Sequence, residues 1–164
     1  MKFDQDRLLR QALLDRLNQT GNDEKQAAVI RPETLPPVVL AYIGDAYFTL
    51  FVRTRLLAFE QKKVRILHSF DARIVSASMQ AVACKQLAND LSEAELNIVR
   101  RGRNTKSVVP KSATVAEYRY STGFEALLGF YFLSGENERL ATIAGKAFKI
   151  ITREITNIDK NGGS

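Results

Sequence analysis

Residues 38–52 read VVLAYIGDAYFTLFV, and Asp45 is the only charged side chain among these apolar and aromatic residues. Pro36 and Pro37 precede the stretch, and proline suits the first position of a helix because the amide there has no partner within the helix. We therefore predict a helix over residues 37–59. An unpaired buried carboxylate costs several kcal/mol, so Asp45 needs a cation, an arginine or a solvent-filled cleft.

A second apolar stretch, GFEALLGFYFLS at residues 123–134, also carries a single charge, on Glu125. Gly44 precedes Asp45, and Gly129 lies one helical turn after Glu125. Glycines at such places let two helices approach closely, so the two carboxylates could meet. Their repulsion would raise the pKa of one acid unless a cation lies between them, and carboxylate oxygens suit Mg²⁺ or Mn²⁺. The residues alone leave open that each acid instead pairs with an interior arginine or with backbone donors.

The rest of the chain shows helical periodicity, which predicts an all-α fold. Leucines at four-residue steps near the N-terminus predict a helix that packs through one apolar stripe. Capping-box spacing at Ser92 to Glu95 and at Thr114 to Glu117 predicts two further helix starts. The expected helices cover about residues 4–18, 37–59, 71–88 with Ser69 as N-cap, 92–102, 114–134 and 138–155.

The composition indicates a globular chain with a preference for anionic partners. Its 164 residues fit one principal domain, and 45% hydrophobic with 26% charged residues argues against disorder. No apolar run is long enough to span a membrane. The net charge of +6 favours a polyanion such as nucleic acid, although charge alone does not prove it.

The opening MKFDQDRLLR lacks the apolar core of a secretory signal, and the single cysteine, Cys84, cannot close an intramolecular disulfide. We therefore expect a cytoplasmic protein. With one cysteine and one histidine, His68, the chain cannot build a zinc site from these residue types. We interpret both side chains as structural, because His68 lies at a helix boundary and Cys84 in an apolar helical setting.

The segment RRGRNTKSVVPK, residues 100–111, combines several cations with a glycine and no acid. Guanidinium groups and an asparagine amide can hold phosphate oxygens or ribose hydroxyls, whereas the alternative is an ordinary solvated basic loop. No aromatic stacking platform is obvious near the segment, which favours a duplex backbone over stacked single strands. The candidate RNA-binding residues are Arg100, Arg101, Arg103, Asn104, Lys106 and Lys111.

These motifs resemble a known family. AYIGDAYF, residues 41–48, resembles the signature helix of ribonuclease III domains, and FEALLGFYFLSG, residues 124–135, resembles their second acidic helix. RGRNTK and VPKSATVAEYRYSTGFEALLG are similar to the Mini-ribonuclease III branch in particular. The resemblance covers about residues 35–140 and leaves no room for the usual double-stranded-RNA-binding domain, which that branch lacks.

The resemblance implies a homodimeric, all-α endoribonuclease that cuts double-stranded RNA with Mg²⁺, for which Mn²⁺ can substitute. Asp45 and Glu125 become catalytic residues and metal ligands, and a metal-activated water leaves 5′-phosphate and 3′-hydroxyl ends. The family also implies maturation of 23S ribosomal RNA precursors and no membrane partner. The expected domains are residues 1–33 as N-terminal helix and linker, 34–158 as catalytic domain and 159–164 as a disordered tail.

Two positions depart from full-length ribonuclease III, which carries acids where this chain has Ala41 and Thr122. The departures leave the number of bound ions open, with water or Thr122 completing the ligand shell. The runner-up interpretation is a non-catalytic helical protein of the same fold that binds double-stranded RNA or the ribosome. A third is a helical dimer whose basic surface meets a protein or a membrane.

Overall fold

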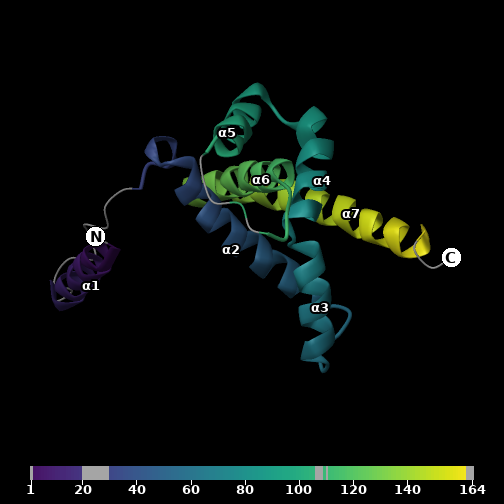
Figure 1. Ribbon diagram of the computed structural model, residues 1–164, viewed down its shortest axis with the longest axis horizontal. Helices are drawn as coiled ribbons and strands as arrows, with labels where there is room; N and C mark the ends of the chain where they lie inside the picture. Colours follow the sequence, from purple (N-terminus) through teal and green to yellow (C-terminus); the bar gives the residue numbers. More distant parts are fainter. Residues whose placement is uncertain (1, 20–29, 106–108, 110, 162–164) are drawn as a thin grey trace. The chain divides into compact units, whose positions relative to one another are not determined.

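The computed structural model describes residues 2–19, 30–105, 109 and 111–161, and within these ranges all regular structure is helical (Figure 1). The predicted all-α fold is confirmed. The contacts divide the chain into two compact units, Met1–Ile30 and Arg31–Ser164. In the described part of the chain, no helix has both the length and the apolar character that crossing a membrane requires.

The first unit contains helix α1 (Lys2–Gln19), where the leucine spacing predicts a helix. The second unit contains a central helix, α6, which packs against α2, α4, α5 and α7 (Figure 1). Its elements are η1 (Pro32–Thr34), α2 (Pro37–Leu56), α3 (Val64–Ile74), α4 (Ala77–Leu87), η2 (Ala88–Asp90), α5 (Glu93–Arg103), α6 (Val115–Ser134) and α7 (Asn137–Asn161).

Helices α2 and α6 form the largest contact in this unit. Gly44, Phe48 and Val52 are buried at four-residue intervals on one face of α2, as expected for a single packed stripe. The Phe48 ring meets the edge of Phe124 on α6, with 5.1 Å between ring centroids. Burial of each large apolar side chain contributes about 1.5–3 kcal/mol, so this seam is a major source of stability.

Both predicted capping boxes are present. The Ser92 hydroxyl accepts from the Glu95 amide at 3.3 Å, and the Glu95 carboxylate accepts from the Ser92 amide at 2.6 Å. Thr114 and Glu117 make the same reciprocal pair at the start of α6. Each box satisfies amide groups that the first helical turn leaves without a partner, and so fixes where α5 and α6 begin.

The prediction of one helix over residues 71–88 with Ser69 as N-cap is wrong. The segment forms two helices, α3 and α4, which are separated at Val75 and Ser76. Ser69 lies inside α3, and Ser76 is the N-cap of α4, where its hydroxyl accepts from the Met79 amide at 3.4 Å. The local sequence offers two serines with similar capping potential, and packing against other helices decides between them. The final helix also runs further than predicted, to Asn161.

Candidate active site

Helices α2 and α6 touch through their main chains at two glycines. A Cβ atom on Gly44 would overlap the carbonyl oxygen of Glu125, and a Cβ atom on Gly129 would overlap the carbonyl oxygen of Leu40. Any other residue at either position would push the helices apart, so the role expected for these glycines from the sequence is confirmed. The contact places the backbone of Glu125 directly against the residue that precedes Asp45.

The two acids of this contact influence each other. Burial raises the pKa of Glu125 to about 8, with the negative charge of Asp45 as the next contribution, while the Gln80 amide on α4 acts in the opposite direction. Burial also raises the pKa of Asp45. Asp45 is nevertheless an exposed residue and Glu125 is half-buried, so the pair lies at a surface that a soluble ion or a phosphate can reach.

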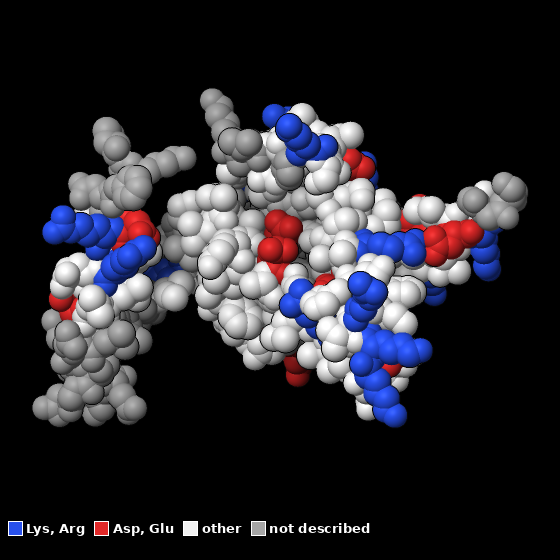
Figure 2. Space-filling view, turned by 60° about the horizontal axis from the view of Figure 1, so that its bottom comes forward, with Lys and Arg blue, Asp and Glu red and all other residues white. Residues whose placement is uncertain are grey.

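Neither acid is neutralised by a basic side chain in the described ranges. The ion pairs within 4.0 Å that join described residues include neither Asp45 nor Glu125. Pairing with an interior arginine, the alternative left open by the sequence, is therefore not found there. In the face drawn in Figure 2, a compact group of acidic side chains lies within mainly uncharged surface, with basic side chains mostly toward its edges.

The donor set around the pair is small. Among the residues that the structure describes, no group of three or more His, Cys, Asp or Glu side chains could hold a metal ion. Ala41 is buried beside Leu40 and Ala126, and the Thr122 hydroxyl donates to the Tyr118 carbonyl on its own helix at 2.9 Å. Two carboxylates that repel each other still fit Mg²⁺, which keeps several waters and needs only one or two protein carboxylates.

Gln80 is a neighbour of the site that the sequence did not indicate. Its side chain is buried, and its amide nitrogen donates to the Val75 carbonyl at 2.9 Å, at the break between α3 and α4. The same amide favours the charged form of Glu125. Gln80 thus connects the acid pair to the α3–α4 junction. These residues are far apart in the chain, so no local sequence pattern predicts the connection.

The residues predicted to form one basic loop do not share one environment. Arg100, Arg101 and Arg103 belong to the last turn of α5, and Asn104 is its C-cap. Arg100, Arg101, Asn104 and Lys111 are exposed, and Arg100 pairs at the surface with Glu93 at 2.6 Å. Lys106 lies outside the described residues.

Arg103 turns inward instead of facing solvent. Its guanidinium carbon lies 3.9 Å from the centre of the Tyr120 ring on α6. The sequence did not indicate this aromatic neighbour of the basic segment. Gly102 also differs from a phosphate-gripping glycine, because a Cβ atom there would lie 2.8 Å from the Cα atom of Gly123; its function is to bring α5 against α6.

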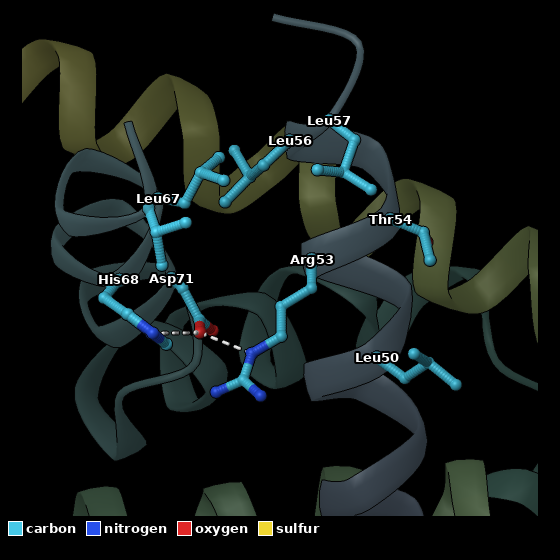
Figure 3. A pocket seen from close by; sticks show the side chains of 9 residues that line it. Leu50, Arg53, Thr54, Leu56, Leu57, Leu67, His68 and Asp71 are labelled. Carbon is cyan, nitrogen blue, oxygen red and sulfur yellow. Dashed lines mark hydrogen bonds and ion pairs between the residues drawn. The ribbon is translucent and has the colours of Figure 1, made fainter. Parts of the chain in front are cut away.

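Cys84 and His68 both occupy structural settings. Cys84 is buried, and burial raises the pKa of its thiol to about 12, so the nucleophilic thiolate is scarce at neutral pH. His68 lines a pocket of about 270 Å³ between α2 and α3, whose other walls are mainly apolar (Figure 3). Arg53 and His68 both point toward Asp71 there, with Arg53 Nε 2.6 Å and His68 Nδ1 4.0 Å from its Oδ2 atom.

The sequence and fold have known relatives. Residues 38–136 match the profile of the ribonuclease III domain. The chain is 47% identical over 119 residues to the Mini-ribonuclease 3 of Thermoanaerobacter sp. (strain X514), and the aligned residues make up 72% of this chain and 84% of the relative. It is 42% identical over 132 residues to the Mini-ribonuclease 3 of Brevibacillus brevis, and the aligned residues make up 80% of this chain and 98% of the relative.

The fold also has a relative among solved structures. A crystal structure of a protein from Fusobacterium nucleatum superposes with a TM-score of 0.65 at 31% identity, covering 71% of this chain and 93% of that chain. The all-helical unit with its acid pair is thus a ribonuclease III domain. The chain belongs to the Mini-ribonuclease 3 family.

Proposed function

We propose that this protein is an endoribonuclease that hydrolyses double-stranded RNA, with Asp45 and Glu125 as its catalytic acids. The observation that carries the proposal is the acid pair itself: two carboxylates held at a main-chain contact, one of them with a pKa of about 8, in a chain that belongs to a ribonuclease family. Perturbed acids without a structural partner are typical of catalytic sites.

The carboxylates of Asp45 and Glu125 would hold Mg²⁺, or Mn²⁺ in its place. Such an ion lowers the pKa of bound water and stabilises charge on a phosphoryl oxygen. The chain contributes the fixed separation of the two acids through Gly44 and Gly129. The Gln80 amide supports the ionised form of Glu125, which is the form that a cation requires.

The remaining features support a duplex substrate and a dimer. Arg100, Arg101, Arg103, Asn104, Lys106 and Lys111 are the proposed RNA-binding residues. Tyr42 and Leu50 on α2 are 76% and 63% exposed, and a second copy of the chain would cover such apolar surface. Two symmetric sites could then address the two strands of one duplex. A 23S ribosomal RNA precursor in the cytoplasm is the proposed physiological substrate.

The decisive experiment incubates the protein with a structured duplex RNA in the presence of Mg²⁺ or EDTA. We expect discrete products with 5′-phosphate and 3′-hydroxyl ends only with Mg²⁺, and none from the Asp45→Asn variant. Asp90→Asn is the matched control, because Asp90 is an exposed acid that pairs with Lys146 away from the acid pair. A 23S precursor stem should be cut in preference to an unrelated duplex. Cleavage that persists in EDTA would contradict the metal assignment.

A non-catalytic double-stranded-RNA-binding protein is the second candidate. It is favoured by the apolar surroundings of Ala41 and by the absence of a third acid beside the pair in the described part of the chain. Such a protein would shift the duplex RNA in a binding assay and never nick it at any Mg²⁺ concentration.

The exposed Arg101 tests the RNA interface. We expect Arg101→Ala to weaken duplex binding to a similar degree across sequences and to reduce the salt dependence of log K by about 0.9, the value for one phosphate contact. Arg153→Ala, an exposed arginine on α7, should leave the salt slope unchanged. Equal slopes for all three proteins would remove Arg101 from the interface.

A further inference from the structure

A second cleft, lined by residues of α4, α5, η2 and α6, is rich in positive charge. Its volume is about 330 Å³, and its lining includes Lys85, Arg100 and Arg103 but no carboxylate. Leu91, Leu96 and Val99 supply an apolar wall. We call this space the basic cleft. Cations beside an apolar wall match the chemistry of a phosphate group attached to a less polar sugar.

Two cations converge on one aromatic ring in the basic cleft. The Arg103 guanidinium lies 3.9 Å and the Lys85 ammonium 4.9 Å from the centre of the Tyr120 ring. Each contact is favourable for the cation concerned, but the two positive charges repel each other. An anion bound between them would relieve this repulsion.

The two cations have no close acid among the described residues. Neither Lys85 nor Arg103 forms an ion pair within 4.0 Å there, and the Nε atom of Arg103 is buried without an acceptor in the same ranges. The hydrogen bonds from Thr114, and then the charge of Lys85, lower the pKa of Glu117, and the Glu117 carboxylate already caps α6 by accepting from the Thr114 amide at 2.8 Å. Arg100, by contrast, is occupied by Glu93. Of the three cations that line the basic cleft, Lys85 and Arg103 are therefore the two without an acidic partner within 4.0 Å among the described residues.

The basic cleft lies along the contact of α4 with α6, and the same contact also reaches Glu125. Gln80 of α4 meets Glu125 of α6, and five residues further along α4 Lys85 meets Tyr120, five residues earlier on α6. The two helices therefore run antiparallel along this contact. Five residues of helix correspond to a rise of about 7.5 Å and a turn of about 140°, so Tyr120 lies about one and a half turns of α6 from Glu125, and the basic cleft opens toward α5.

We propose that the basic cleft binds a backbone phosphate of the RNA strand, with Lys85 and Arg103 as its ligands and Tyr120 as the residue that orients both. The proposal rests on the proposed function, because it takes RNA as the substrate. It adds Lys85 and Tyr120, which lie outside the basic segment, and it gives Arg103 a defined partner. The cleft would hold the strand beside the bond to be cut and so position that bond at the acid pair.

The test measures binding of a labelled duplex RNA over a range of KCl concentrations in a Glu125→Gln background, which prevents cleavage. We expect Lys85→Ala to weaken binding several-fold and to lower the salt slope by about 0.9. Tyr120→Leu should weaken binding without removing a charge, whereas Tyr120→Phe, which keeps the ring, should bind like the parent. Lys149→Ala on α7 is the matched control for loss of one exposed lysine. Thermal unfolding of each variant checks that the fold is kept.

The outcomes separate this proposal from the proposed function. Suppose that the parent binds the duplex, and that Lys85→Ala and Tyr120→Leu bind it with the affinity and salt slope of the parent. The proposed phosphate site is then wrong, and the ribonuclease proposal stands. If the parent neither binds nor, with Glu125 restored, cuts duplex RNA, both are wrong. An increase in thermal stability with inorganic phosphate that Lys85→Ala abolishes, together with unchanged RNA slopes, would identify a site for small anions and overturn the RNA assignment.

Discussion

Glu95 on α5 and Glu125 on α6 are both acids packed against the same helical unit, but their surroundings differ. Glu95 is 2% exposed, and its carboxylate accepts from Arg139 Nε at 2.7 Å and from the Tyr131 hydroxyl at 2.7 Å. Burial alone would raise the pKa of Glu95, but Arg139, Tyr131 and Ser92 outweigh it and lower the pKa to about 2. Glu125 has no such set of donors, and its pKa is about 8.

The difference separates an acid that holds the fold together from one that is available to a ligand. Asp71 is intermediate, because Arg53 Nε donates to its Oδ2 atom at 2.6 Å while its Oδ1 atom is buried without a hydrogen-bond partner in the described ranges. A charge whose partners are all supplied by the chain has no need of an ion. Asp45 and Glu125 have no basic partner within 4.0 Å among the described residues, and this is the condition that the proposed metal site requires.

The largest expected effect is on catalysis. Replacing Glu125 by Gln removes one of the two proposed metal ligands, and we expect RNA cleavage to fall by at least about a thousandfold, since metal catalysis supplies several kcal/mol. Glu95→Gln should keep its activity per folded molecule. Single-turnover cleavage of duplex RNA measures both. Full activity in Glu125→Gln would show that Glu125, like Glu95, is not needed for catalysis.

The second-largest expected effect is on stability, and here the sensitive acid is Glu95 and not Glu125. Glu95→Gln leaves Arg139 without its charged partner, and we expect the free energy of unfolding to fall by about 2–4 kcal/mol at pH 7. Glu93→Gln, which breaks an exposed pair with Arg100, should cost at most about 1 kcal/mol. Urea denaturation compares the two variants. Equal losses of unfolding free energy in Glu95→Gln and Glu93→Gln would show that the buried Glu95–Arg139 pair contributes no more to stability than the exposed Glu93–Arg100 pair.

The two acids should also give stability opposite pH dependences. Because the pKa of Glu125 is raised to about 8, the folded protein holds its proton more tightly, and stability falls by about 1–3 kcal/mol as pH rises from about 4.5 to 8 without metal. Because the pKa of Glu95 is lowered to about 2, its contribution is present above about 4.5 and is lost as pH falls toward 2. The free energy of unfolding can be measured by urea denaturation at a series of pH values in EDTA. We expect its fall between about pH 4.5 and 8 to disappear in Glu125→Gln and to remain in Glu95→Gln.

The smallest effect is stabilisation by the metal. Addition of Mg²⁺ at about ten times its dissociation constant should raise the free energy of unfolding by about 1.4 kcal/mol. The gain should disappear in Asp45→Asn and in Glu125→Gln and persist in Glu95→Gln. Thermal unfolding with and without Mg²⁺ measures it, and a gain that survives in Asp45→Asn would place the ion elsewhere.

The sequence was informative wherever a local pattern carried the structure. The lone acids and their glycines predicted the contact of α2 with α6, and the two capping boxes predicted where α5 and α6 begin. The break at Ser76 was missed because Ser69 offers an equally good local signal. Gln80 and Tyr120 were missed because each meets its partner, Glu125 or Arg103, only through the packing of separate helices, which no spacing in the chain encodes.

The main-chain contact at Gly44 and Gly129 has a consequence for how this site tolerates change. Side chains normally set the spacing between helices, so a substitution in the core shifts whatever the helices carry. Here peptide atoms meet peptide atoms. The surface and the outer helices can therefore vary without moving the two carboxylates, which makes the acid pair a fixed unit around which new specificities can be built.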